Sequence, residues 1–230
     1  MLTIAFDTST KNLSVALYRE CQFLDVLNFE GEGYVHSEKL LPFIQDLLAK
    51  NKLQLSQLEG ILIGTGPGSY TGLRIGASAA KALSYSLDIP VYGMTSNEIL
   101  YWSCLNQAES IGANKIVTMI DARRDEVYLQ IFNVDGQSSG EIESKIIDQE
   151  FVDSLNSEKV LWCGDGAIKF QDRFDLGESM ISTTCVINEV GGLNRFFETE
   201  RLPQLLLDTA YFDANYVKSY QPGKKKSLFN

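Results

Sequence analysis

The sequence predicts an α/β protein made of two related halves, each with a mixed sheet flanked by helices. An apolar run that ends in an aspartate opens each half: residues 2–7 end in Asp7, and residues 115–121 end in Asp121. A segment of alternating apolar and polar residues follows each run, as expected for a half-buried strand. After these strands, short β-branched runs alternate with segments of helical spacing. The boundary between the halves is expected between Gln107 and Lys115.

The first half is predicted to have the order βββαβαβα. Its first three strands read as an antiparallel meander in which the first strand is buried. The next segment is a helix with Ser37 as its N-cap and Pro42 near its start, where proline is tolerated. Thr95 or Ser96 is expected to cap the last helix of this half. The expected elements are strands at 2–7, 13–18, 23–29, 60–64 and 91–94, and helices at 37–50, 70–87 and from about 96 to 108.

The second half repeats the opening of the first. Asp135-Gly136 marks a turn between two of its strands. Its expected elements are strands at 115–121, 126–132, 140–147 and 160–163, a short helix at 149–156 and a last large helix at 188–197. The domain division predicted from this order is 1–108, 109–200 and a C-terminal tail at 201–230.

The composition fits a soluble protein of a reducing compartment. The formal net charge is −10 and the isoelectric point is about 4.7, so contact with nucleic acid needs a local basic patch or a basic partner. Lys224–Lys226 is a short basic stretch that reads either as a solvated terminus or as a contact for RNA or an acidic partner. Four widely spaced cysteines predict neither a zinc site nor a disulfide framework. With no basic leader and no apolar run of membrane length, the expected location is the cytoplasm, with no membrane contact.

The stretch Ile61–Gly76 has the pattern strand, glycine-rich turn, helix. It is not a Walker A loop, because no lysine precedes Ser69 or Thr71, and Ser69 stands where a dinucleotide fingerprint has its third glycine. The turn is therefore expected to be a tight turn capped by Ser69. Small residues recur every four positions in the helix, at Gly72, Gly76, Ala80 and Ser84. Such a face either packs closely on the chain's own sheet or meets a helix of a partner subunit.

Asp7 and Asp121 each follow a predicted buried strand, where an aspartate either holds a metal or a catalytic water or caps a turn. In actin-like and sugar-kinase-like ATPases, two such turns clasp phosphates and contain glycine. The turns here contain none, and Gly164-Asp165-Gly166 takes the place of the adenosine loop. Nucleotide binding is therefore expected to be vestigial at most, without efficient hydrolysis. The residues concerned are Asp7, Thr8, Ser9, Asp121, Arg123, Gly164 and Gly166.

The chain has a single histidine, His36, which limits the catalytic sites that it can form. A two-histidine metal site cannot form. A Ser-His-Asp triad would have to use His36, and no G-x-S-x-G elbow is present to supply its serine. A surface or capping role is expected for His36. No catalytic residue and no metal site are predicted.

Three collinear motifs give the chain a family resemblance. They are Ile4–Thr10, Gly64–Gly76 (GTGPGSYTGLRIG) and Ile120–Tyr128. Together they resemble the TsaB (YeaZ) family of tRNA threonylcarbamoyladenosine biosynthesis. The resemblance implies an actin-like ATPase fold, related to ribonuclease H, with two tandem domains. It also implies a non-catalytic partner of TsaD, which transfers a threonylcarbamoyl group to N6 of adenosine 37 of tRNA. TsaE, a P-loop ATPase, joins the assembly, and tRNA is met indirectly through the complex.

The resemblance further implies that no cofactor is required, with weak ATP or ADP binding at most. TsaD carries a His-x-x-x-His pair whose positions correspond here to Gly93 and Asn97, so the metal ligands are missing. In TsaB-like dimers, the first two helices of one protein pack on those of the other. A homodimer in isolation and a TsaD heterodimer would use overlapping surfaces, and Gly76→Leu would disrupt pairing while the monomer stays folded. The implied interface is Leu40, Leu41, Ile44, Leu48, Tyr70, Gly72, Leu73, Gly76, Ala80, Leu83 and Ser84.

Two other functions fit less well. A kinase of the actin-like fold that acts on a small molecule without partners conflicts with the turns that follow Asp7 and Asp121, which lack glycine. A metallopeptidase conflicts with the single histidine and with the lack of an H-E-x-x-H motif.

Overall fold

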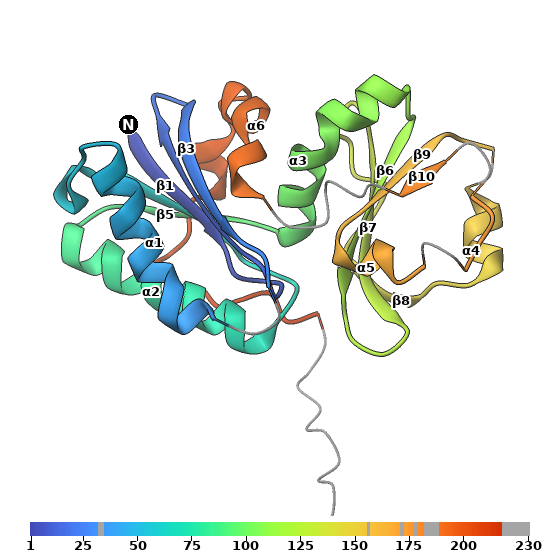
Figure 1. Ribbon diagram of the computed structural model, residues 1–230, viewed down its shortest axis with the longest axis horizontal. Coiled ribbons are helices and arrows are strands. Elements are labelled where there is room, and N and C mark those ends of the chain that lie inside the picture. Colours follow the sequence, from blue (N-terminus) through green and yellow to red (C-terminus); the bar gives the residue numbers. More distant parts are fainter. Residues whose placement is uncertain (32–34, 156, 171–172, 177–178, 182–188, 218–230) are drawn as a thin grey trace, which may run out of the picture.

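The computed structural model of the chain describes residues 1–31, 35–155, 157–170, 173–176, 179–181 and 189–217. It contains two five-stranded mixed sheets, which stand side by side with α3 between them (Figure 1). Lys224–Lys226, Cys185 and the first residue of the helix expected at 188–197 lie outside the described residues.

The first sheet has the order β3-β2-β1-β4-β5. β1 pairs antiparallel with β2 and parallel with β4, so the strand that ends in Asp7 is central. All six of its residues are buried, which confirms the expected buried first strand of a meander. The strands are β1 (Leu2–Asp7), β2 (Leu13–Arg19), β3 (Gln22–Phe29), β4 (Gly60–Gly64) and β5 (Val91–Met94).

The second sheet repeats this topology, with the order β10-β9-β6-β7-β8. β6, which ends in Asp121, pairs antiparallel with β7 and parallel with β9, as β1 does with β2 and β4. The predicted class, two related α/β halves with mixed sheets, is therefore confirmed. The strands are β6 (Lys115–Asp121), β7 (Glu126–Asn133), β8 (Glu143–Ile146), β9 (Val160–Cys163) and β10 (Met180–Ile181).

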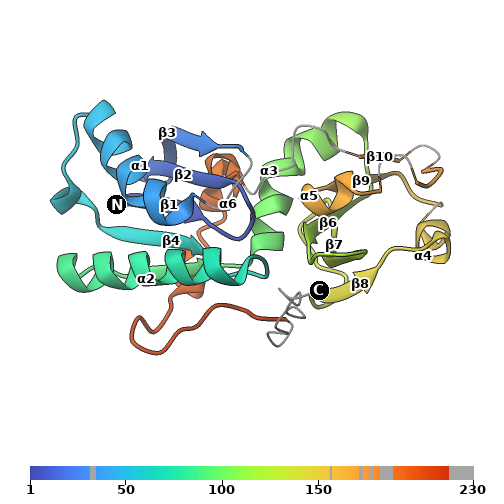
Figure 2. The ribbon, with the colours of Figure 1, turned by 60° about the horizontal axis from the view of Figure 1, so that its bottom comes forward.

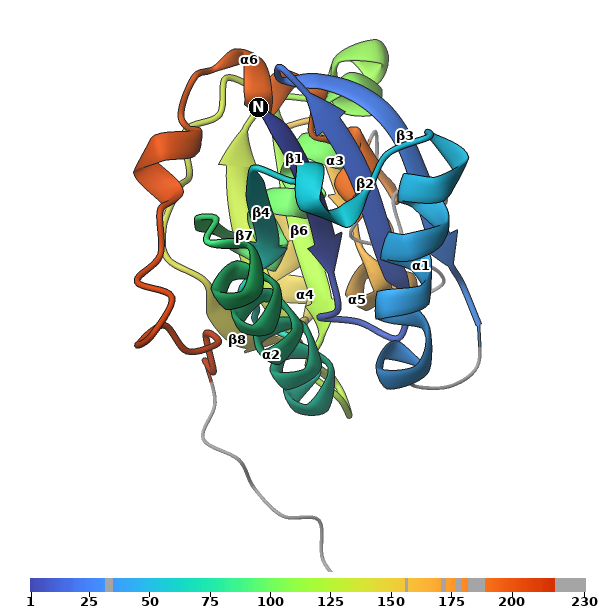
Figure 3. The same ribbon diagram turned by 90° about the vertical axis from the view of Figure 1, so that its left-hand side faces the viewer.

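Two long helices cover one face of the first sheet, side by side (Figure 3). Ser69 caps the second of them through its hydroxyl, which accepts from Gly72 N at 3.2 Å, and Thr95 caps the helix between the sheets. Both caps were predicted, whereas Ser37 lies inside its helix and does not cap it. The helices are α1 (His36–Lys50), α2 (Tyr70–Leu87), α3 (Ser96–Ile111), α4 (Gln149–Ser154), α5 (Asp165–Ile168) and α6 (Asn194–Glu198), with 3-10 turns η1 (Leu55–Gln57), η2 (Val190–Gly192) and η3 (Leu202–Leu205).

The predicted last large helix is wrong. The chain forms η2 and the five-residue α6 instead. Two glycines end η2, and a Cβ at Gly192 would lie 2.8 Å from the backbone of Ser103, so the chain approaches α3 closely at this point. The strand expected at 140–147 is shorter, covering only β8.

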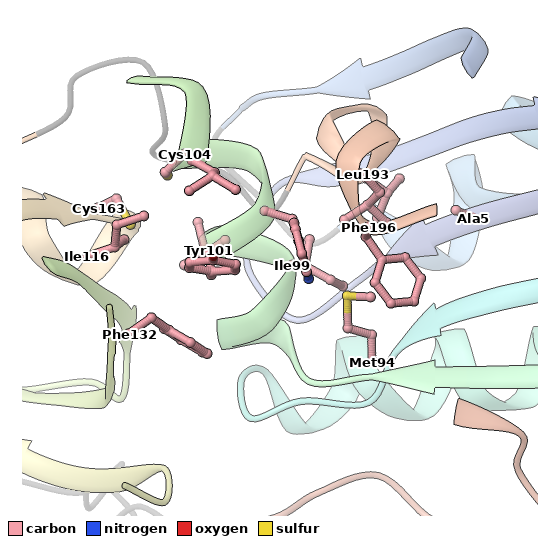
Figure 4. Packing of buried hydrophobic residues seen from close by; sticks show 14 of the residues in the cluster. Ala5, Met94, Ile99, Tyr101, Cys104, Ile116, Phe132, Cys163, Leu193 and Phe196 are labelled. Carbon is pink, nitrogen blue, oxygen red and sulfur yellow. The ribbon is translucent and has the colours of Figure 1, made fainter. Parts of the chain in front are cut away.

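One hydrophobic core joins the two halves (Figure 4). It holds Ala5 and Met94 from the first sheet, Ile116 and Cys163 from the second, and a row of α3 side chains between them. A second core lies under α1 and α2, and a third fills the space between the second sheet and α4. α3 is therefore apolar on more than one side because it is buried against both sheets.

After residue 189 the chain returns to the first sheet. The buried Tyr18 hydroxyl donates to Val190 O at 2.6 Å and accepts from Leu193 N at 3.1 Å. Further on, Leu207 N donates to Val91 O at 2.9 Å, and the segment then runs alongside α2 (Figure 2). The domain division at 108 and 200 stays a prediction. These hydrogen bonds show that residues 190–217 pack on the first half, which no residue pattern predicts.

Cys104 and Cys163 are buried free thiols, as expected of core cysteines, whereas Cys21 is exposed in the β2–β3 turn. Among the helices of the described residues, none is long and apolar enough to cross a bilayer.

Candidate functional site

A surface groove lies between α1 and α2 in the first half of the chain. It has a volume of about 600 Å³. Its exposed apolar residues include Leu41, which is 52% exposed although it lies on a helix. We call this surface the α1–α2 groove; it is lined by His36, Ser37, Leu40, Leu41, Tyr70, Thr71, Arg74, Ile75, Ser78 and Ala79.

The small-residue face of α2 does not open into this groove. A Cβ at Gly72 would lie 2.1 Å from Thr8 O, and a Cβ at Gly76 would lie 2.4 Å from Thr8 Oγ1. The glycines are needed because the loop after β1 passes directly under α2. Gly72 and Gly76 are therefore covered by the chain's own loop, which is the close-packing interpretation of this face. Whether Gly76→Leu leaves the monomer folded stays a prediction.

The predicted interface residues thus fall into two groups. Leu41 and Tyr70 lie at the groove, where a partner could reach them. Leu40 also lines the groove but is only 1% exposed. The others are buried within the chain itself: Ile44, Leu48, Gly72, Leu73, Gly76, Ala80, Leu83 and Ser84. Ser84, for example, donates its hydroxyl proton to Ile89 O at 2.5 Å, beside the end of α2.

Asp7 is a structural carboxylate in this fold. It is 2% exposed and accepts from Ser9 N at 2.9 Å, from Ser9 Oγ at 2.6 Å and from Ser96 Oγ at 3.2 Å. The first bonds make the turn after β1, and the last ties that turn to α3. The sequence left two interpretations open for Asp7, a ligand of a metal or catalytic water and a turn cap. The hydrogen bonds from Ser9 and Ser96 support the turn cap.

His36 lies beneath the groove and not on the surface. It is fully buried, and its Nε2 is 2.8 Å from Thr10 O. The predicted surface role is wrong because α1 begins at His36 itself, which turns the imidazole inward against the loop after β1. A Cβ at Gly72 would also touch this ring, at 3.0 Å, so loop, imidazole and α2 form one packed unit.

Asp121 has a cationic partner that sequence reasoning missed. Lys169, at the end of α5, forms an ion pair with its carboxylate, which also accepts from Arg123 N at 2.6 Å. Asp165 lies beside this pair and accepts from Asp121 N at 2.9 Å. Burial raises the pKa of Asp165 to about 6, against the hydrogen bond from Asp121 N, and the nearby Asp121 charge raises it further.

This shift predicts a pH-dependent stability. The folded pKa of Asp165 lies above the ordinary value of 3.8, so the protonated form favours the folded state and this contribution is lost as the pH rises through about 6. Asp165→Asn keeps an oxygen acceptor for Asp121 N and removes the ionisation. We expect the variant to gain on the order of 2 kcal/mol over the native chain at pH 8 and nothing at pH 4.

Urea unfolding at both pH values measures this difference. Asp46→Asn, on the exposed side of α1, is the matched control and should show no pH-dependent gain. An equal effect of the two substitutions at pH 8 would contradict the assignment.

The two glycines expected at an adenosine loop serve the chain's own packing. A Cβ at Gly164 would lie 2.1 Å from Met119 O, and one at Gly166 would lie 3.0 Å from the same atom. The β9–α5 turn therefore rests directly on β6. The seven residues predicted as a vestigial nucleotide site remain in two sets, one around Asp7 and one around Asp121, and whether a nucleotide binds them stays a prediction.

The two positions that correspond to the TsaD histidines have other structural roles. A Cβ at Gly93 would collide with Thr65 Cγ2 at 2.6 Å and with Leu207 Cδ1 at 2.7 Å. Asn97 is fully buried, and its Nδ2 donates to Thr118 Oγ1 at 2.9 Å, which ties α3 to β6. Within the described ranges, no cluster of three His, Cys, Asp or Glu side chains could hold a metal ion.

The comparisons with known proteins agree with this arrangement. A family model described as "TsaD: tRNA N6-adenosine threonylcarbamoyltransferase" matches residues 34–165. The tRNA threonylcarbamoyladenosine biosynthesis protein TsaB of Escherichia coli is 31% identical over 154 residues, which cover 66% of this chain and 64% of that protein. Its namesake in Bacillus subtilis is 36% identical over 152 residues, covering 65% and 61%.

Further relatives extend the agreement. TsaB of Haemophilus influenzae is 35% identical over 127 residues, covering 54% of this chain and 51% of that protein. The chain therefore spans between half and two thirds of the length of these curated relatives. The solved structure of YeaZ from Pseudomonas aeruginosa superposes with a TM-score of 0.74 at 23% identity, covering 94% of this chain and 99% of that one, which shows the same fold. Because curated relatives at 31–36% identity are TsaB proteins and the fold matches that of YeaZ, the chain belongs to the TsaB (YeaZ) family.

Proposed function

We propose that this chain is a non-catalytic subunit in the transfer of a threonylcarbamoyl group to tRNA, and that it pairs with a TsaD-type transferase through the α1–α2 groove. The observation that carries the proposal is an exposed apolar groove in a protein whose acidic turns are already engaged by its own side chains. TsaE and tRNA would join the same complex.

The groove has the features of a helix-docking surface. Its two walls are formed by residues of α1 and α2, and Leu41 and Ile75 supply apolar surface that water solvates poorly. Burying one leucine side chain contributes about 1.5–3 kcal/mol. Tyr70 adds an aromatic ring whose face is covered by the Arg74 guanidinium, 4.3 Å from the ring centroid. Aromatic and arginine side chains are typical centres of protein interfaces.

The acidic turns support a role without catalysis. Asp7 is enclosed by Ser9 and Ser96, and Asp121 is neutralised by Lys169, so neither carboxylate presents the open anionic site that a magnesium nucleotide needs. These contacts favour a chain that requires no cofactor and binds ATP or ADP weakly at most. They also weigh against an independent kinase.

The same groove would pair two copies of the chain in isolation. A face that is apolar and exposed in the monomer tends to be covered in solution. TsaD and a second copy would then compete for one surface, and the homodimer would dissociate when TsaD binds.

Leu41→Glu and Ser78→Glu test the proposal, because both residues line the groove and are exposed in the monomer. Each should weaken binding of the TsaD protein of the same organism by tenfold or more, since a carboxylate in an apolar interface loses its hydration. Calorimetry measures the affinity, and tRNA modification by TsaD with and without the chain measures the consequence.

Tyr85→Glu is the matched control. Tyr85 lies on α2, is 91% exposed and does not line the groove. Its substitution should leave the affinity for TsaD unchanged. Normal TsaD binding by both groove variants, or full tRNA modification in the absence of the chain, would contradict the proposal.

A further inference from the structure

The turn between β6 and β7 has an unusual backbone. Arg123 and Arg124 both adopt the left-handed conformation, with φ of 68° and 56°. Glycine, asparagine and aspartate are the residues that normally take this conformation, and other residues lose roughly 1 kcal/mol or more there. The turn lies at the lower end of the second half in Figure 1, where β6 ends and β7 begins. Two adjacent arginines thus adopt a backbone conformation that is unfavourable for both of them.

A lysine holds this turn in place. Lys169 Nζ donates to Arg124 O at 3.0 Å and to Glu126 O at 3.3 Å, in addition to its ion pair with Asp121. The Asp121 carboxylate in turn accepts from Arg123 N. Strained backbone persists where the surrounding structure over-determines it, and such positions concentrate at functional sites. The contacts of Lys169 use only backbone atoms of the arginines, so both guanidinium groups remain outside this network.

Neither arginine of this turn takes part in the ion pairs that lie beside it. Lys169 is paired with Asp121, and Arg173 lies 3.5 Å from Asp125. Arg123 and Arg124 are exposed, and within the part of the chain that the structure describes no ion pair joins either to a carboxylate. The chain as a whole carries −10. Two adjacent guanidinium groups on such a surface carry the charge opposite to that of phosphate oxygens, which the planar fork of arginine binds well.

We propose that Arg123 and Arg124 contact the phosphodiester backbone of the tRNA on which the complex acts. This inference rests on the proposed function for its choice of RNA. It gives an acidic protein a local basic contact, which long-range repulsion makes necessary. The held turn would fix the backbone of both arginines before RNA arrives, so little backbone ordering is needed on binding.

The strain allows a variant that loses the charge without losing the fold. Arg123→Asn combined with Arg124→Gly removes both guanidinium groups and supplies residues that favour the left-handed conformation, so the turn should be at least as stable as the native one. Arg123→Lys with Arg124→Lys keeps the charge. Lys52→Gly is the matched control at another site. Lys52 follows the C-terminal end of α1, is an exposed cation, and also has a positive φ, of 57°.

The experiment titrates fluorescently labelled tRNA with each protein, alone and together with the TsaD protein of the same organism, over a series of salt concentrations. The asparagine–glycine variant should bind roughly tenfold more weakly at low salt, and the slope of log affinity against log salt should fall by about 1.5. The lysine variant and Lys52→Gly should retain most of the affinity and the slope. Calorimetry with TsaD runs in parallel.

Unchanged tRNA affinity and salt slope in the asparagine–glycine variant would overturn the inference. Loss of TsaD binding by that variant would also overturn it, because the turn would then contact protein. The proposed function is tested separately, because it is contradicted if the native chain does not bind TsaD. In that case, a tRNA affinity that still depends on the two arginines would support the present inference on its own.

Discussion

Gly72→Ala should lower the free energy of unfolding by about 3 kcal/mol, even though alanine favours a helix by about 1 kcal/mol over glycine. The new methyl group would meet Thr8 O at 2.1 Å, and a backbone oxygen inside a packed loop cannot move without disturbing β1. Gly76→Ala should cost less, about 2 kcal/mol, because its Cβ would meet the Thr8 side chain at 2.4 Å and not the backbone.

A double-mutant cycle with Thr8→Ala separates these two cases. Removing Thr8 Oγ1 opens space for the methyl group at position 76 but leaves Thr8 O in place, so Thr8→Ala should rescue Gly76→Ala and not Gly72→Ala. Urea unfolding gives the free energies. Ala82→Ser, on the exposed side of α2, is the control and should change stability by less than about 0.5 kcal/mol. Additive effects of Thr8→Ala and Gly76→Ala would contradict the packing described here.

Phe196→Ala should be the most destabilising single truncation considered, at about 4 kcal/mol. Phe196 is fully buried, and its ring lies 5.8 Å from the Trp102 ring and 5.5 Å from the Phe197 ring. It fills the space between the returning C-terminal segment and α3, as Figure 4 shows. Its loss leaves a cavity that rigid neighbours on three elements cannot close.

Two measurements check this expectation. Urea unfolding should show the loss of stability, and limited proteolysis should cleave faster between residues 189 and 217, because the segment is held to the first sheet through α6. Phe23→Ala is the control: Phe23 is 38% exposed on β3, and its truncation should cost about 1 kcal/mol. Equal cleavage rates in Phe196→Ala and the native chain would show that α6 does not hold the segment.

The features that the sequence predicts well are those encoded by local periodicity. The strand pairs around Asp7 and Asp121 follow from alternation, and the Ser69 cap follows from one hydroxyl before an apolar helix. Residue spacing alone cannot show what a helix face packs against, which is why Gly72 and Gly76 suggested a partner although the chain's own loop covers them.

The missed features depend on contacts between residues far apart in the chain. Lys169 reaches Asp121 across 48 positions, and no local pattern marks it. The returning segment is built from short 3-10 turns, the five-residue α6 and extended chain, without the sustained period of a long helix or a strand. Tyr18 contacts this segment over 172 positions. His36 is buried because α1 is capped at Val35, two residues before the predicted cap Ser37.

The core shared by the two sheets has a mechanical consequence. Rotating one half against the other would separate Met94 and Ile99 from Ile116 and Phe132, and would expose apolar surface that contributes about 25 cal/mol per Å² when buried. A hinge through α3 is therefore disfavoured by the same contacts that stabilise the fold. The molecule should behave as one rigid body, without domain closure around a ligand. A partner would therefore meet the α1–α2 groove and the turn at Arg123 and Arg124 in a fixed relative placement.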